Sequence, residues 1–158
     1  MAAVTPQISL REYRALAELR YVVRRFLNFS DAAARAANVE PQQHQLLLAI
    51  KGMPKGGRPT IGTVAERLQL HHNSAVELAQ RSIERGLVER RSSKTDRREV
   101  LLHVTPKGDR LLRRLSLAHR SELRSAGPVL GRALDALVGD SQTPAKVMSK
   151  KKARGTRR

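Results

Sequence analysis

The chain has 158 residues, of which 40% are hydrophobic and 3% aromatic, and its formal net charge is +17. The length and the hydrophobic fraction exclude a wholly disordered chain and predict one folded domain with an aliphatic core. The absence of cysteine excludes disulfides and thiolate metal sites, and the positive charge favours phosphate backbones or anionic surfaces as partners.

Residues 9–38 are predicted to form one long helix. Apolar side chains recur at helical spacing from Leu10 to Phe29, in a stripe wide enough for burial on two sides. Ser9 and Glu12 fit a capping box at the start of this helix. A second helix is predicted from Pro41 to Gly52, and a loop dense in glycine and proline follows it.

Two short helices are predicted next, and their tight joint makes them a helix-turn-helix candidate. The first is TIGTVAERL, the joint is QLHH, and the second is NSAVELAQRSIER, which Gly86 ends. The second helix has its apolar positions at Ala75, Val76, Leu78, Ala79 and Ile83. An open alternative places the N-cap at Ser74 with Glu77 as its capping-box partner, which would leave both histidines in the turn.

A two-stranded ribbon is predicted after these helices. GLVERR and VLLHVT are its strands, SSKTDRRE is a polar turn, and the run from Val100 to Leu102 is expected to hold the ribbon to the core. Thr105 and Pro106 then begin a helix that runs to about Ala126. Gly127 and Pro128 are predicted to break the chain before a last short helix, and residues 141–158 are predicted to be a disordered basic tail.

This order of elements resembles the MarR family of winged helix-turn-helix regulators over residues 9–140. The most specific motifs are Gly86-Leu87-Val88-x-Arg90, Asp96-x-Arg98 and the segment from Leu101 to Gly108. The resemblance implies a mainly α fold with a small β-hairpin wing. It makes residues 42–105 the DNA-binding winged helix, and residues 9–38 and 106–140 the dimerisation helices. Ser82 departs from the family pattern, which usually has leucine there.

The resemblance implies a homodimeric, sequence-specific DNA-binding transcription regulator, expected to be a repressor on a pseudo-palindromic operator. The candidates for base contacts from the recognition helix are His71, His72, Asn73, Ser74 and Glu77, whose polar groups can pair with base edges. The entry HHNS differs from the common entry of the family, so the bases read can differ. A metal site at the adjacent histidines is disfavoured, because they cannot easily face one ion.

The candidates for the wing are Lys94, Asp96, Arg97 and Arg98. The resemblance implies that Asp96 holds Arg98 in a fixed pose for the minor groove, and a plain solvated turn is the alternative. The candidates for phosphate contacts are Arg81, Arg85, Arg90, Arg91 and Lys107. The basic tail can add nonspecific affinity for nucleic acid or remain solvated and idle.

The resemblance also implies a pocket for a small aromatic or carboxylate effector, between the dimer helices and the winged domain. The candidates are Tyr13, Tyr21, Arg24, Arg25, Phe26 and His44, each of which also has an ordinary role as a core or surface residue.

Other classes of function fit the sequence less well. Motifs such as G-x-G-x-x-G, the P-loop, H-E-x-x-H and G-x-S-x-G are absent, so neither an enzyme nor a cofactor is expected. The remaining alternative is a nonspecific architectural nucleic-acid-binding protein, which the charge would fit but the polar entry HHNSAVE does not. No apolar run reaches transmembrane length, no signal peptide pattern is present, and a cytoplasmic, nucleoid-associated location is expected.

Overall fold

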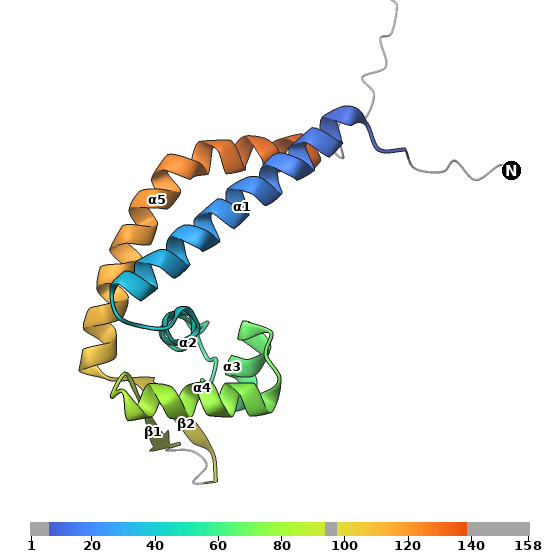
Figure 1. Ribbon diagram of the computed structural model, residues 1–158. Coiled ribbons are helices and arrows are strands. Elements are labelled where there is room, and N and C mark those ends of the chain that lie inside the picture. The colour runs from blue at the N-terminus through green and yellow to red at the C-terminus, as the bar shows by residue number, and fades with distance from the viewer. Residues whose placement is uncertain (1–6, 94–97, 139–158) are drawn as a thin grey trace, which may run out of the picture. The chain divides into compact units, whose positions relative to one another are not determined.

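The computed structural model describes residues 7–93 and 98–138 (Figure 1). The chain forms two compact units, one of residues 7–23 and 127–138 and the other of residues 24–126. The elements are α1 (Leu10–Ala36), α2 (Pro41–Lys51), α3 (Ile61–Leu68), α4 (His72–Glu84), β1 (Val88–Ser92), β2 (Val100–Val104) and α5 (Pro106–Val138). Among the described helices, none is both long and apolar enough to cross a membrane. The predicted tail, residues 141–158, lies outside the described ranges.

Local hydrogen bonds define both ends of α1. The Ser9 hydroxyl accepts a hydrogen bond from the Glu12 amide at 3.2 Å, and the Glu12 carboxylate accepts one from the Ser9 amide at 2.6 Å, which confirms the predicted capping box. At the other end Asn38 adopts a left-handed φ of 57°, and the amide of Val39 donates to the Ala34 carbonyl at 3.1 Å. This closure of the last turn ends α1 at Ala36, two residues before the predicted end.

The core of the second unit is aliphatic, as predicted. Leu46 and Leu47 of α2, Leu78 of α4 and Leu102 of β2 are almost fully buried. Helix α2 contacts α3, α4 and β2, so it lies at the centre of the winged helix. Burial of each of these leucines contributes roughly 1.5–3 kcal/mol to the stability of the fold. This contribution is enough to fix the position of α4 without aromatic residues.

The predicted ribbon is present as an antiparallel hairpin in which Val88 pairs with Val104 and Arg90 pairs with Leu102. The expectation that Val100 to Leu102 holds the hairpin to the core is correct only for Leu102. Val100 is 45% exposed, because it lies two residues nearer the tip, beyond the edge of the core.

The predicted break at Gly127 and Pro128 is wrong, since α5 is continuous through both residues. Proline removes one backbone hydrogen bond from a helix, but it ends the helix only if the turn before it cannot remain helical. The ring of a proline also clashes with the backbone N–H and the Cβ of the preceding residue. Gly127 has no Cβ, so that part of the clash is absent here. The other end of α5 is as predicted, because the Thr105 hydroxyl accepts a hydrogen bond from the Gly108 amide at 3.1 Å.

Candidate nucleic-acid interface and pockets

The joint between α3 and α4 is a turn of three residues, 69–71. Gln69 has a left-handed φ of 54°, and the amide of Leu70 donates to the Ala65 carbonyl at 2.9 Å, which closes the end of α3. His71 is the extended N-cap of α4, and the helix begins at His72. The predicted joint is therefore one residue too long, and His72 belongs to the helix.

The alternative start of α4 at Ser74 is wrong. The amide of Ala75 donates to the His71 carbonyl at 3.0 Å, so the first helical turn is already closed before Ser74 could act as a cap. All five residues predicted to read bases, His71, His72, Asn73, Ser74 and Glu77, are exposed at this end of α4. The buried side of α4 carries Ala75, Leu78, Ala79 and Ser82. Because the opposite side of α4 is buried, the polar side chains at the start of the helix face solvent.

The geometry of α4 bears on two further positions, Val76 and Ser82. Val76 was predicted as one of the apolar core positions, but it is 36% exposed, because it lies away from the buried side that Ala75 and Leu78 define. Ser82 replaces the usual leucine and is fully buried; its hydroxyl donates to the Leu78 carbonyl at 2.8 Å. Burying this small polar residue is tolerated because its hydrogen bond is satisfied within the helix.

The hairpin follows α4 through a tight turn. The amides of Gly86 and Leu87 donate to the Ile83 and Ser82 carbonyls at 2.8 and 2.9 Å, and Gly86 has a φ of 68°. This is the predicted glycine end of α4. The wing candidates Lys94, Asp96 and Arg97 lie outside the described residues, whereas Arg98 is described and exposed. The role of Asp96 toward Arg98 stays a prediction.

The five candidates for phosphate contacts differ in what else they bind. Arg85 donates to the Gln43 side chain at 3.1 Å and to the Asn38 carbonyl, and Lys107 donates to the Arg85 carbonyl at 2.7 Å. Arg81 pairs with Glu40 at 3.6 Å, and Arg91 pairs with Glu89. Arg90 is exposed on β1. Arg85 and Lys107 therefore stabilise the junction of α4 with its neighbours, apart from any contact with DNA.

A cavity of about 700 Å³ opens among α1, α2 and α5 within the second unit. It is lined by Phe26, Leu27, Ser30, His44, Gln45, Leu48, Ser116, His119, Arg120, Leu123 and Arg124. Of the predicted effector residues, only Phe26 and His44 line it. Arg25 instead pairs with Glu122 at 3.5 Å, and Tyr13 and Tyr21 are exposed residues of the other unit. His119 was missed, because its place beside His44 depends on how α5 packs on α2.

His44 and His119 form a buried, stacked pair at this cavity. Their ring centroids are 4.8 Å apart with an interplanar angle of 20°, and the rings of Phe26 and Phe29 meet His119 edge-on. Burial, followed by the charge of His119, lowers the pKa of His44, while Asp31 opposes the change. Among the described residues, His44 Nδ1 and His119 Nε2 are buried without a hydrogen-bond partner. These two nitrogens could hydrogen-bond a polar group of a bound molecule.

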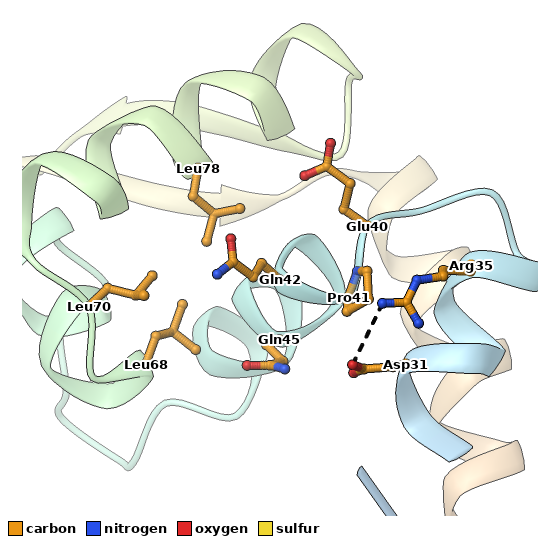
Figure 2. A pocket seen from close by; sticks show the side chains of 9 residues that line it. All are labelled: Asp31, Arg35, Glu40, Pro41, Gln42, Gln45, Leu68, Leu70 and Leu78. Carbon is orange, nitrogen blue, oxygen red and sulfur yellow. Dashed lines mark ion pairs between the residues drawn. The ribbon is translucent and has the colours of Figure 1, made fainter. Parts of the chain in front are cut away.

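A second cavity, of about 500 Å³, lies beside the joint (Figure 2). Figure 2 shows Leu68, Leu70 and Leu78 on one side of the glutamines of α2, with Arg35 and Asp31 on the other. The Arg35 and Asp31 side chains are 3.9 Å apart. This cavity touches the joint directly, but its charged groups are already paired, Asp31 with Arg35 and Glu40 with Arg81. It therefore offers a ligand less than the histidine cavity does.

Comparison with known proteins agrees with this geometry. Residues 37–99 match the MarR family model, and no curated protein matches the chain. A MarR family protein from Bacillus stearothermophilus superposes with a TM-score of 0.66 at 18% identity, covering 87% of this chain and 100% of the other. The S. aureus MepR–DNA complex superposes with a TM-score of 0.61 at 14% sequence identity, and the match covers 85% of this chain and 97% of the MepR chain. CouR from Rhodococcus jostii RHA1, bound to p-coumaroyl-CoA, superposes with a TM-score of 0.61 at 21% sequence identity, and the match covers 80% of this chain and 90% of the CouR chain. At these identities the similarity establishes the fold.

Proposed function

The winged helix of this chain, matched over residues 37–99, belongs to the MarR family, and on that premise we propose that the chain is a sequence-specific DNA-binding repressor that acts as a homodimer. The observation that carries the proposal is the exposed start of α4. Polar side chains of residues 71–74 and Glu77 gather there, on a helix whose opposite side is fixed in an aliphatic core.

Helix α4 enters the major groove in this proposal, and its first residues meet the base edges. Asn73 can pair with adenine and Glu77 can accept a hydrogen bond from a cytosine amine. The hairpin reaches the adjacent minor groove with Arg98, which a narrow groove attracts by its negative potential. Arg81, Arg90 and Arg91 contact phosphates, which sets affinity and its salt dependence rather than sequence choice.

Dimerisation through α1 and α5 is supported by the apolar side chains that these helices leave exposed. More than half of the side-chain surface is exposed at Leu10, Tyr13, Tyr21 and Val138. Single apolar residues scattered over a surface are normal, but several large ones along the same two helices indicate an interaction surface. A two-fold dimer presents two copies of α4 to DNA, so the operator is a pseudo-palindrome with half-sites about one helical turn apart.

The histidine cavity is the proposed effector site. Its volume suits a small molecule, Phe26 supplies an aromatic wall, and the exposed Arg120 and Arg124 lie at its edge where a carboxylate could bind. The p-coumaroyl-CoA bound by CouR combines an aromatic group with acidic groups. An aromatic acid that binds this cavity contacts both α2 and α5, and release of DNA on binding is the expected response.

A nonspecific architectural role remains the second candidate, because the net charge of +17 alone gives affinity for any duplex. Selection of bound DNA from a random pool separates the two functions. A regulator enriches a motif with two-fold symmetry, and replacing Asn73 by alanine changes the enriched bases. An architectural protein enriches no motif, and that result would reject sequence-specific regulation.

A further inference from the structure

The loop between α2 and α3 holds the base of the hairpin. The Pro59 carbonyl accepts a hydrogen bond from the amide of Leu102 at 2.8 Å, and Leu102 is fully buried. The next residue, Thr60, is the N-cap of α3, and its hydroxyl accepts a hydrogen bond from the Thr63 amide at 3.2 Å. The backbone of this loop therefore connects the central part of β2 to the start of the helix-turn-helix.

The side chain of Arg58 makes a second attachment, nearer the tip. Its guanidinium donates to the Ser93 hydroxyl at 2.6 Å and pairs with the Glu99 carboxylate. Ser93 and Glu99 face each other across the hairpin, because the Ser93 amide donates to the Glu99 carbonyl at 2.9 Å. Ser93 is buried, and the Glu99 side chain is only 25% exposed. One guanidinium thus contacts both sides of the hairpin, at Ser93 after β1 and at Glu99 before β2.

We propose that Arg58 is the positioning residue of the wing: it fixes the hairpin against the start of α3, so that the wing and α4 meet DNA as one pre-oriented surface. The inference rests on the proposed function, because positioning has value only if both elements contact DNA. A hairpin held in its bound pose loses less conformational entropy on binding than one that swings on its base. Both contacts come from the same guanidinium nitrogen, Nη2, which carries two N–H groups. These two N–H groups point in fixed directions in the guanidinium plane, whereas the ammonium group of lysine rotates freely, so arginine suits this role better.

The first test uses the protein without DNA. Amide hydrogen exchange is compared at Ser93 and Leu102 in the wild type and in Arg58→Ala, with Lys55→Ala as the control, because Lys55 is an exposed cation of the same loop. Exchange at Ser93 should rise about ten-fold or more in Arg58→Ala and stay unchanged in Lys55→Ala. The double variant Arg58→Glu with Glu99→Arg should recover protection that each single variant loses. Unchanged exchange in Arg58→Ala would overturn the proposal.

The second test uses a DNA duplex carrying the motif enriched from the random pool. Arg58→Ala should weaken binding about ten-fold while the slope of log affinity against log salt stays at the wild-type value. A slope reduced by about one would overturn the proposal, because it would make Arg58 a phosphate contact. If the wild type selects no motif, the proposed function fails by itself, and the exchange experiment still decides whether Arg58 holds the hairpin.

Discussion

His44 and His119 are the residues at which the chemistry of this chain is most unusual. Two imidazoles stacked 4.8 Å apart and almost completely buried cannot both carry a proton without strong repulsion. The pair lies in the proposed effector cavity, with Phe26 beside it and Arg120 and Arg124 at the edge. A bound anion would offset the cost of a charge there, so binding of an aromatic acid is expected to favour proton uptake by His44.

The lowered pKa of His44 predicts that the fold loses stability in acid. The unfolded chain has an ordinary histidine pKa of about 6.5, so it binds more protons than the folded chain once the pH falls below that value. The contribution is therefore fully present above about pH 6.5 and is lost as the pH falls from there. Urea unfolding of the wild type and of His44→Gln, between about pH 8 and pH 5.5, measures it. His44→Gln should flatten the pH dependence of the free energy of unfolding. Equal slopes in the wild type and His44→Gln would contradict the prediction.

Gly108, in the first turn of α5, is the tightest point between that helix and the hairpin. A Cβ at this position would lie 2.2 Å from the Leu87 carbonyl oxygen and 2.9 Å from a methyl of Val104. Gly108→Ala should therefore lower the free energy of unfolding by about 2–3 kcal/mol, because the backbone must move. Gly62→Ala in α3 is the matched control, since its nearest neighbour would be 3.9 Å away and the change should be neutral or slightly stabilising. Similar urea midpoints for the two variants would refute this packing argument.

Elements could be predicted from the sequence where local chemistry decides them. Ser9, Gly86 and Thr105 end or begin their helices as their side chains or backbone freedom require. The start of α4 could not be decided, because Ser74 is an equally good cap on local grounds. Its actual start at His72 follows from the left-handed turn at Gln69, which fixes the direction in which α4 begins.

The continuous α5 and the wing attachment depend on longer-range packing. Pro128 is a strong local signal against a helix, yet α5 continues through it, and the missing Cβ of Gly127 removes part of the clash with the proline ring. Arg58 gave no signal in the sequence, because its partners Ser93 and Glu99 lie 35 and 41 positions further along the chain. His119 was missed for the same reason, whereas His44 was a candidate through the family resemblance.

For the whole molecule, the exposed apolar side chains of α1 and α5 predict a homodimer. Replacing both Leu10 and Val138 by glutamate puts charges on two side chains that are each 64% exposed in the single chain. Sedimentation velocity should find a dimer for the wild type and a monomer for this double variant, since charges buried at an apolar interface are strongly unfavourable. Val100→Glu, on the hairpin, should remain a dimer. A monomeric wild type, or a double variant that still dimerises, would exclude dimerisation through these helices.

Selective DNA binding is the property on which the proposed function depends. The most direct measurement is the affinity for the duplex enriched from the random pool and for a scrambled duplex of the same composition, at about 150 mM salt. We predict that the wild type binds the enriched duplex at least about a thousand-fold more tightly, and that Arg98→Ala removes part of this preference. Equal affinity for the two duplexes would contradict a sequence-specific regulator and leave a protein that binds DNA through its charge.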